Sequence, residues 1–219
     1  MTTDSTKPDA GYWQMSTYLF AGQGLKNDRT DDAWHVDWPL ALQSRMWQAV
    51  YQEIWDESVV LPIYRGKHCR MQFPDMPISQ PVQICSNRTR QLLEKLAPMD
   101  IQYLPVQLEH KGKPIGEGQH WIMNLLHIVD CVDEGDADWR YHTYTKGKMY
   151  ETWTIDPSRV PNEVRIFRVK GAQSPVVVTD GVRSAVEQAR ITGVGFGPLG
   201  HLFSRAPDWK PGPLEPPPS

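Results

Sequence analysis

One order of sequence features occurs twice in this 219-residue chain and limits the folds that it can adopt. Each copy begins with a short apolar segment after a proline and continues to a residue that can cap a helix, Ser86 in the first and Asp180 in the second. Such a side chain accepts a hydrogen bond from an unpaired amide of the first helical turn. A second apolar segment follows, with an aromatic residue two positions before a proline. We therefore predict a strand, a helix and a strand in residues 81–106 and again in residues 175–199.

A further helix is expected near the N-terminus, at residues 40–57. Trp47, Tyr51 and Trp55 recur there at four-residue spacing, which places them on one face of a helix. We interpret this face as packed against the core rather than as an aromatic binding surface. The sequence thus predicts an α+β fold. It is expected to be a compact body of two related strand–helix–strand halves (residues 81–106 and 175–199) with an N-terminal amphipathic helix.

Other strands are expected around these helices. Residues 121–132 are apolar on both faces, which fits a buried strand or a buried helix, and their β-branched residues favour the strand. Residues 141–154 alternate aromatic and polar side chains around the turn sequence KGK, which is typical of a hairpin. Residues 59–64 and 164–169 also show strand patterns.

The chain length allows one or two domains, and the composition favours one folded body between two tails. Residues 1–10 are polar and residues 207–219 read PDWKPGPLEPPPS, so we expect both ends to be disordered. Residues 11–206 then form a single α+β domain. The 23 basic and 26 acidic residues give a formal net charge of −3, which does not favour nucleic-acid binding by bulk electrostatics.

The cysteines and the N-terminus indicate the compartment. Cys69, Cys85 and Cys131 are widely spaced and contain no Cys-x-x-Cys pair, so neither a disulfide framework nor a zinc site is expected. The N-terminal residues do not read as a secretory signal, and no run reaches the about 18 apolar residues that a membrane helix needs. We expect a soluble, cytoplasmic protein that binds neither nucleic acid nor membranes.

Two features could indicate an enzyme. Residues 195–200 formally match the dinucleotide fingerprint G-x-G-x-x-G, but a helix precedes them and Pro198 removes an amide that a phosphate would need. Cys85 lies at a predicted helix start, where a thiolate is favoured, yet no base or orienting residue accompanies it. The seven histidines show no metal-ligand spacing. We therefore predict no catalytic, cofactor or metal site, and a protein that is not an enzyme.

Acidic residues gather in one segment. Residues 130–138 read DCVDEGDAD, with five acidic residues and no basic one, and a tryptophan follows. A solvated loop is the simpler explanation, and capture of a basic protein partner is the functional one. In such capture, charge speeds the encounter and aromatic side chains supply affinity. The candidate partner-binding residues are Asp133, Glu134, Asp136, Asp138 and Trp139.

Several short segments, taken in order, resemble one bacterial family. They are VQICSNRTRQLLE at 82–94, YLPV at 103–106, WIMN at 121–124, IFRVKG at 166–171, VVVTD at 176–180 and ITGVGFGPL at 191–199. This order resembles the DUF1629 family, also described as the immunity protein family Imm11, over residues 80–200. The resemblance implies a cytoplasmic antitoxin of a polymorphic toxin system. Such a protein binds and blocks a cognate toxin that is delivered between bacteria and encoded by an adjacent gene.

Three functions stay open. The first is an immunity protein that occludes a toxin stoichiometrically. The second is a small cytoplasmic enzyme that uses Cys85 or the glycine-rich segment 193–200, and the third is an adaptor protein of a secretion system. Binding of the adjacent gene's product would favour the first function. Catalytic turnover by the isolated protein that is lost on Cys85→Ala would favour the second. Constant assembly with secretion components would favour the third.

Overall fold

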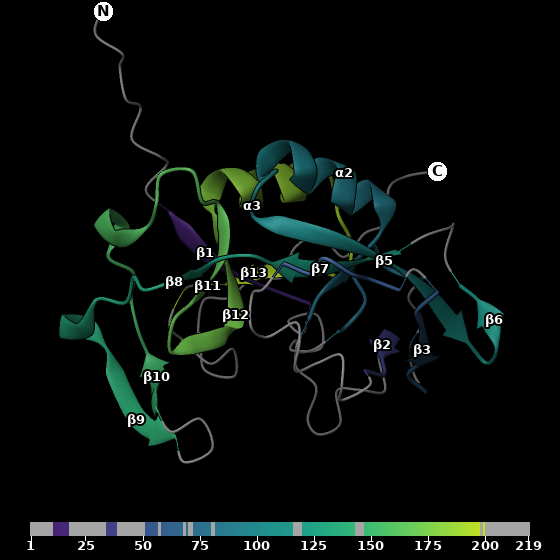
Figure 1. The fold of residues 1–219 in the computed structure, drawn as a ribbon, viewed down its shortest axis with the longest axis horizontal. Coiled ribbons are helices and arrows are strands. Elements are labelled where there is room, and N and C mark those ends of the chain that lie inside the picture. The colour runs from purple at the N-terminus through teal and green to yellow at the C-terminus, as the bar shows by residue number, and fades with distance from the viewer. Residues whose placement is uncertain are drawn as a thin grey trace, which may run out of the picture.

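The computed structural model describes residues 11–17, 34–38, 51–56, 58–67, 69, 72–79, 82–115, 120–142, 147–197 and 199. In these residues two main sheets lie next to each other along the long axis, and both helices lie on the same side of them (Figure 1). The predicted tails, residues 1–10 and 207–219, lie outside the described residues. The prediction of a single domain between them stays a prediction.

The first main sheet has the strand order β13, β1, β12, β11, β8. Its strands span Tyr12–Ser16 (β1), Ile128–Val129 (β8), Ile166–Val169 (β11), Ala172–Thr179 (β12) and Gly195–Gly197 (β13). β1 is antiparallel to both of its neighbours, with Trp13 opposite Val178 and Met15 opposite Phe196. A strand from the N-terminus thus joins two strands from the C-terminal part of the chain.

The second main sheet has the order β2, β3, β5, β7, β4, and β6 pairs with one end of β5. Its strands span Trp34–Val36 (β2), Val60–Arg65 (β3), Ile84–Cys85 (β4), Ile101–His110 (β5), Lys113–Pro114 (β6) and His120–Leu125 (β7). The long strand β5 pairs with β7 along its first part and with β3 along its second, antiparallel to the one and parallel to the other.

The two helices are α2 (Asn87–Leu96) and α3 (Asp180–Gln188). Ser86 caps α2 as predicted, since its side-chain oxygen accepts a hydrogen bond from the amide of Thr89 (3.3 Å). The cap of α3 is Thr179 instead of Asp180, and its side chain makes no capping bond. Asp180 lies inside the first turn, where its carboxylate accepts a hydrogen bond from the indole of Trp13 (2.9 Å).

Both helices share a core with both sheets. Leu93 of α2 and Val186 of α3 pack in one buried cluster with Met15 of β1 and Met123 of β7. Each helix therefore buries an apolar face against the strands below it, which is the main source of stability for short helices. Neither helix in the described part of the chain is long and apolar enough to cross a membrane.

The predicted α+β class with two related strand–helix–strand halves is wrong, because the fold is mostly β-sheet. The described residues contain thirteen strands, two short α-helices and two single turns of 3₁₀-helix. The strands that flank each helix are not paired with one another, since β7 separates β4 from β5 and β1 separates β12 from β13. The helices predicted at 87–96 and 182–190 are present, but β4 has two residues where β12 has eight. The two segments are therefore not equivalent halves of the fold.

The predicted N-terminal amphipathic helix is also wrong in the part of it that the structure describes, residues 51–56. The described part of that segment is not helical, because the Gln102 side chain binds both backbone groups of Gln52 (2.8 and 2.7 Å), which a helix would need for itself. Tyr51 is 61% exposed, contrary to its predicted place in the core, and Trp55 is only partly buried. Trp47 lies outside the described residues.

A hairpin is present close to the predicted residues 141–154, but its bounds differ and Gly147 and Lys148 of the predicted turn lie in its second strand. It is formed by β9 (Asp138–His142) and β10 (Gly147–Thr152). The apolar segment 121–132 contains two short strands, β7 and β8, which belong to different sheets, in place of the one strand expected. This division is what carries the chain from the second main sheet to the first.

Candidate functional site

The β9–β10 hairpin forms a sheet of its own at one end of the molecule (Figure 1). Its strands are antiparallel, with Trp139 opposite Tyr150 and Tyr141 opposite Lys148. In the part of the chain that the structure describes, neither strand pairs with a strand of the main sheets. The hairpin is thus an arm that leaves the body after residue 133 and returns at residue 153.

The base of this arm is firmly held. Val132 and Ile155 form an antiparallel bridge, and the amide of Asp133 donates to the carbonyl of Thr154 (3.0 Å). Val132 and Trp153 are 1% and 5% exposed, and both pack into a buried cluster with residues of β11 and β12. The arm therefore leaves from a packed, hydrogen-bonded base that fixes its direction.

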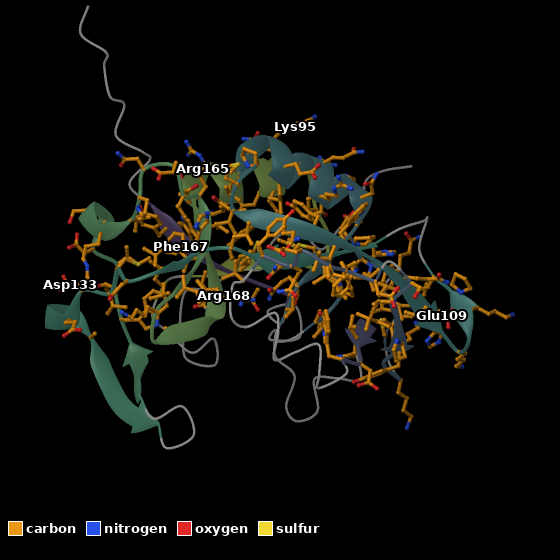
Figure 2. All side chains as sticks on the ribbon, in the orientation of Figure 1. Lys95, Glu109, Asp133, Arg165, Phe167 and Arg168 are labelled. Carbon is orange, nitrogen blue, oxygen red and sulfur yellow. The ribbon has the colours of Figure 1, made fainter. Side chains whose placement is uncertain are left out.

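The acidic run forms a tight turn at this base. We call Asp133–Asp136 the acidic turn; residues 134–136 form one turn of 3₁₀-helix, η3 (Glu134–Asp136). Asp133 caps it, since its side chain accepts a hydrogen bond from the amide of Gly135 (3.0 Å). Asp133 and Glu134 are exposed, and Figure 2 shows Asp133 at the end of the molecule opposite Glu109.

The other predicted partner-binding residues follow directly. Asp136 ends η3, and Asp138 and Trp139 begin β9. The structure describes the backbone of these three residues and not their side chains. The five predicted residues, which are neighbours in the sequence, thus extend from the acidic turn into the first residues of the arm.

Asp130, the first acidic residue of the run, is engaged within the protein. Its carboxylate accepts hydrogen bonds from Lys170 (2.9 Å) and from Arg159 (2.9 Å), which lie 40 and 29 residues away in the chain. The Lys170 hydrogen bond and the two positive charges lower the pKa of Asp130. Arg159 also donates to the carbonyl of Val132 (2.9 Å), which ties it to the base of the arm. Sequence reasoning missed both basic residues because only the tertiary fold brings them to Asp130.

The first enzyme-like feature, Cys85, does not have the geometry of a site. Its side chain is 0% exposed in the core between α2 and the sheets. Burial raises the pKa of its thiol far above neutral pH. A buried, protonated thiol cannot act as a nucleophile.

The second enzyme-like feature, the glycine-rich segment, is explained by packing. Gly195–Gly197 is strand β13, paired with β1. Gly193 has a φ of +82°, and a Cβ at this position would overlap the carbonyl oxygen of Met76. The glycine there allows two backbone segments to approach closely.

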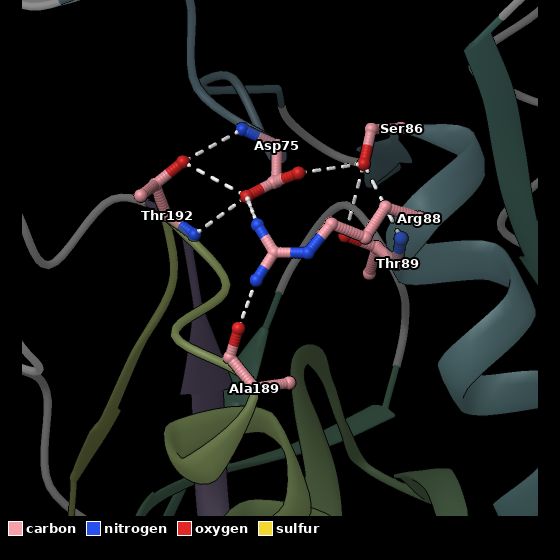
Figure 3. Close-up of polar contacts among 6 residues, drawn as sticks. All are labelled: Asp75, Ser86, Arg88, Thr89, Ala189 and Thr192. Atoms are coloured by element: carbon pink, nitrogen blue, oxygen red, sulfur yellow. Dashed lines mark hydrogen bonds and ion pairs between the residues drawn. The ribbon is translucent and has the colours of Figure 1, made fainter. Parts of the chain in front are cut away.

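A polar cluster joins three segments near α2, as Figure 3 shows. Asp75 accepts hydrogen bonds from Ser86 (2.8 Å) and Thr192 (3.0 Å) and forms an ion pair with Arg88 (3.3 Å). Arg88 also donates to the carbonyl of Ala189. Each of these polar groups bonds within the protein, so the cluster holds the three segments together. In the described ranges, no group of three or more His, Cys, Asp or Glu side chains could hold a metal ion.

Comparison with known proteins identifies a family. A family model described as the immunity protein family Imm11 matches residues 5–201, which confirms the resemblance over a longer stretch than the motifs covered. The match includes both main sheets, the acidic turn and the arm. A comparison with curated proteins finds no match.

Proposed function

The chain belongs to the Imm11 immunity protein family, and from this premise we propose that it neutralises a cognate bacterial toxin by binding it stoichiometrically and covering its active site. The family match, which spans residues 5–201, is the observation that carries this proposal. A blocking protein needs a complementary surface rather than a reaction centre. The buried state of Cys85 and the packing role of Gly193 agree with that requirement.

We place the toxin-binding surface at the acidic turn and the start of the arm. Asp133 and Glu134 are exposed there on a base that is packed and hydrogen-bonded, so little conformational freedom is lost when a partner binds. Their negative charge steers a basic partner surface into contact. Asp136 and Asp138 extend the charge, and Trp139 supplies an aromatic anchor of the kind that dominates binding energy.

The affinity must be high, because an inhibitor has to remain bound for as long as toxin is present. A dissociation constant of about 1 nM corresponds to about −12 kcal/mol. Interfaces of this kind usually bury roughly 1,200–2,000 Å² in total. The acidic turn alone is too small for that area, so the proposed interface includes the arm.

The setting proposed for this activity is the cytoplasm of a bacterium that competes with its neighbours. The toxin would enter from another cell through a delivery apparatus such as a type VI secretion system, and its gene would lie beside the gene for this chain. The description of the family as immunity proteins supports this setting. These points apply to this chain as proposals.

The direct test is to co-express the chain with the toxin domain encoded by the adjacent gene. We expect restored growth of intoxicated cells, a 1:1 complex by light scattering and a dissociation constant in the nanomolar range or below. The chain expressed alone should be inert. If no product of a neighbouring gene binds, the proposed function is wrong.

The surface itself is tested with charge-neutral variants. The quadruple variant Asp133→Asn, Glu134→Gln, Asp136→Asn and Asp138→Asn should slow association at low salt and flatten its salt dependence. Asn still caps the turn, so the melting temperature should change little. The matched control compares Asp133→Asn/Glu134→Gln with Glu53→Gln/Glu109→Gln, which removes the same charge elsewhere. An unchanged association rate for the acidic-turn variants would remove this turn from the interface.

A further inference from the structure

We propose that the toxin binds by adding one of its own strands to the outer edge of β9, which no described strand covers, so that the two proteins share a three-stranded sheet. This inference rests on the proposed function and specifies how the toxin is held. In an antiparallel pair, each strand uses alternate N–H and C=O groups for its partner and turns the others away. Among the described residues β9 pairs only with β10, so the outward groups of residues 138–142 face no other strand.

The acidic turn lies on the β9 side of the arm. At the base, Asp133 bonds to Thr154, and the next register pair is Asp138 with Thr152. Five steps along the first strand thus correspond to two along the second, so the extra residues belong to the segment that leads into β9, which contains the acidic turn. A strand added to β9 would end beside Asp133 and Glu134. The added strand is therefore expected to carry Lys or Arg at that end, which is the charge complementarity that distinguishes this edge from that of β10.

The arm is suited to accept a third strand. A hairpin of two strands is marginally stable alone, and three strands with side-chain packing are considerably more stable. Its base is already fixed by the bridge between Val132 and Ile155, so the edge is presented in a defined direction. Exposed strand edges are templates for pairing with another chain, and strand addition is a recurrent mode of protein recognition.

The occupant is the toxin rather than a second copy of this chain. Antiparallel pairing of all five residues of β9 with β9 of a second copy would place Arg140 opposite Arg140. Like charges directly opposite each other destabilise a strand pair. A toxin strand has no such restriction at that position.

Amide hydrogen exchange by NMR gives the direct test, with the toxin domain encoded by the adjacent gene as the probe. In the free protein, alternate amides of residues 138–142 should exchange quickly and the others slowly. In the complex, we expect the fast amides of β9 to slow at least tenfold, with no change for those of β10 and α2. A complex that leaves the β9 amides unchanged, or protects only those of β10, overturns the inference. Protection of β9 by concentration-dependent dimerisation without toxin also overturns it.

Proline variants give an independent test. The amides of Arg140 and Tyr141 point in opposite directions, so one of the variants Arg140→Pro and Tyr141→Pro removes an outward N–H and keeps the hairpin bond. We expect that variant to retain the wild-type melting temperature and to lose at least tenfold in toxin affinity. The matched pair on β10, Lys148→Pro and Met149→Pro, should contain a stable variant with unchanged affinity. Wild-type affinity in both β9 variants contradicts strand addition, whereas absence of any wild-type complex contradicts the proposed function itself.

Discussion

Asp75 and Thr192 lie 117 residues apart in the chain and exchange three hydrogen bonds of 3.0 Å. The amide of Asp75 donates to the Thr192 hydroxyl, and the amide and hydroxyl of Thr192 donate to the Asp75 carboxylate. Arg88 and Ser86, at the start of α2, bind the same carboxylate (Figure 3). This pair therefore connects the segment before β4 with the segment before β13, and through them the two main sheets.

Replacing Asp75 by Ala should lower the free energy of unfolding by about 2–4 kcal/mol, because several hydrogen bonds to a charged group are lost and the amide of Thr192 is left without its acceptor. Urea denaturation measures the change. Asp75→Asn should cost less, since an amide oxygen still accepts from Thr192. Arg88→Ala should cost under about 1 kcal/mol, because the Arg88 side chain is 52% exposed. Equal losses of unfolding free energy in Asp75→Ala and Arg88→Ala would show that Asp75 is not the centre of this polar cluster.

Gly193→Ala should destabilise the protein far more than Gly112→Ala. Both glycines have positive φ, +82° and +72°, so each alanine carries the strain of about 1–2 kcal/mol that this conformation imposes. A Cβ at Gly193 would also overlap Met76 and lie 2.8 Å from the Cβ of Pro74, whereas one at Gly112 meets nothing within 4 Å. We expect Gly193→Ala to lower the free energy of unfolding by at least about 3 kcal/mol. Thermal unfolding of the two variants measures the difference, and similar midpoints would contradict a steric origin.

Removal of the Asp100 side chain should lower the free energy of unfolding substantially. Asp100 is 1% exposed, and its carboxylate accepts hydrogen bonds from the amides of Arg165 and Ile166, both 2.7 Å, at the start of β11. Its Oδ1 atom also lies 3.3 Å from Nε2 of His127. Asp100→Ala leaves two amides without acceptors and should cost about 3 kcal/mol in urea denaturation. His127→Gln, which removes only the partly exposed partner, should cost under about 1 kcal/mol; a larger loss there than in Asp100→Ala would assign the stability to the ion pair.

The three cysteines should be inert toward thiol reagents in the folded protein. Cys85 and Cys131 are 0% exposed and Cys69 is 5% exposed. Titration with a coloured disulfide reagent at pH 8 should detect none of them quickly and all three after unfolding in guanidinium. A single fast thiol in the native protein would show that one of these sites opens.

Burial raises the pKa of Cys131 from 9.0 to about 11, and this shift has a definite consequence for alkaline stability. The folded state holds the proton more tightly than the unfolded state, so the contribution of Cys131 is complete below pH 9.0 and declines as the pH rises towards 11. Chemical unfolding at pH 8, 9 and 10 should show this decline, with a smaller slope in Cys131→Ala. Equal slopes in the two proteins would contradict the shift.

Local signals predicted local structure correctly. The cap at Ser86 and the apolar residues after it located α2 because a capped amphipathic helix is determined by neighbouring residues. The described end of the predicted helix, residues 51–56, shows the opposite case. Its aromatic spacing favours a helix, but Gln102, 50 residues away, binds the backbone of Gln52, and no local pattern contains that contact.

The candidate site divides in the same way. The charge of the acidic run can be read directly, and the capped turn at Asp133 is a local structure. The neutralisation of Asp130 by Arg159 and Lys170 depends on how the base of the arm folds against η4 (Pro157–Arg159) and β11, so it could not be predicted. That no described strand of either main sheet pairs with the arm is likewise a property of the whole topology.

The position of β1 between β12 and β13 affects the timing of protection in a growing cell. When residues 12–16 leave the ribosome, both of their neighbours in the sheet are still unmade, and β12 begins at residue 172. At bacterial translation speeds this delay lasts on the order of 10–30 s, during which β1 has no strand to pair with. Under the proposed function, nascent chains would therefore give no protection, and the cell would need finished copies before any toxin arrives.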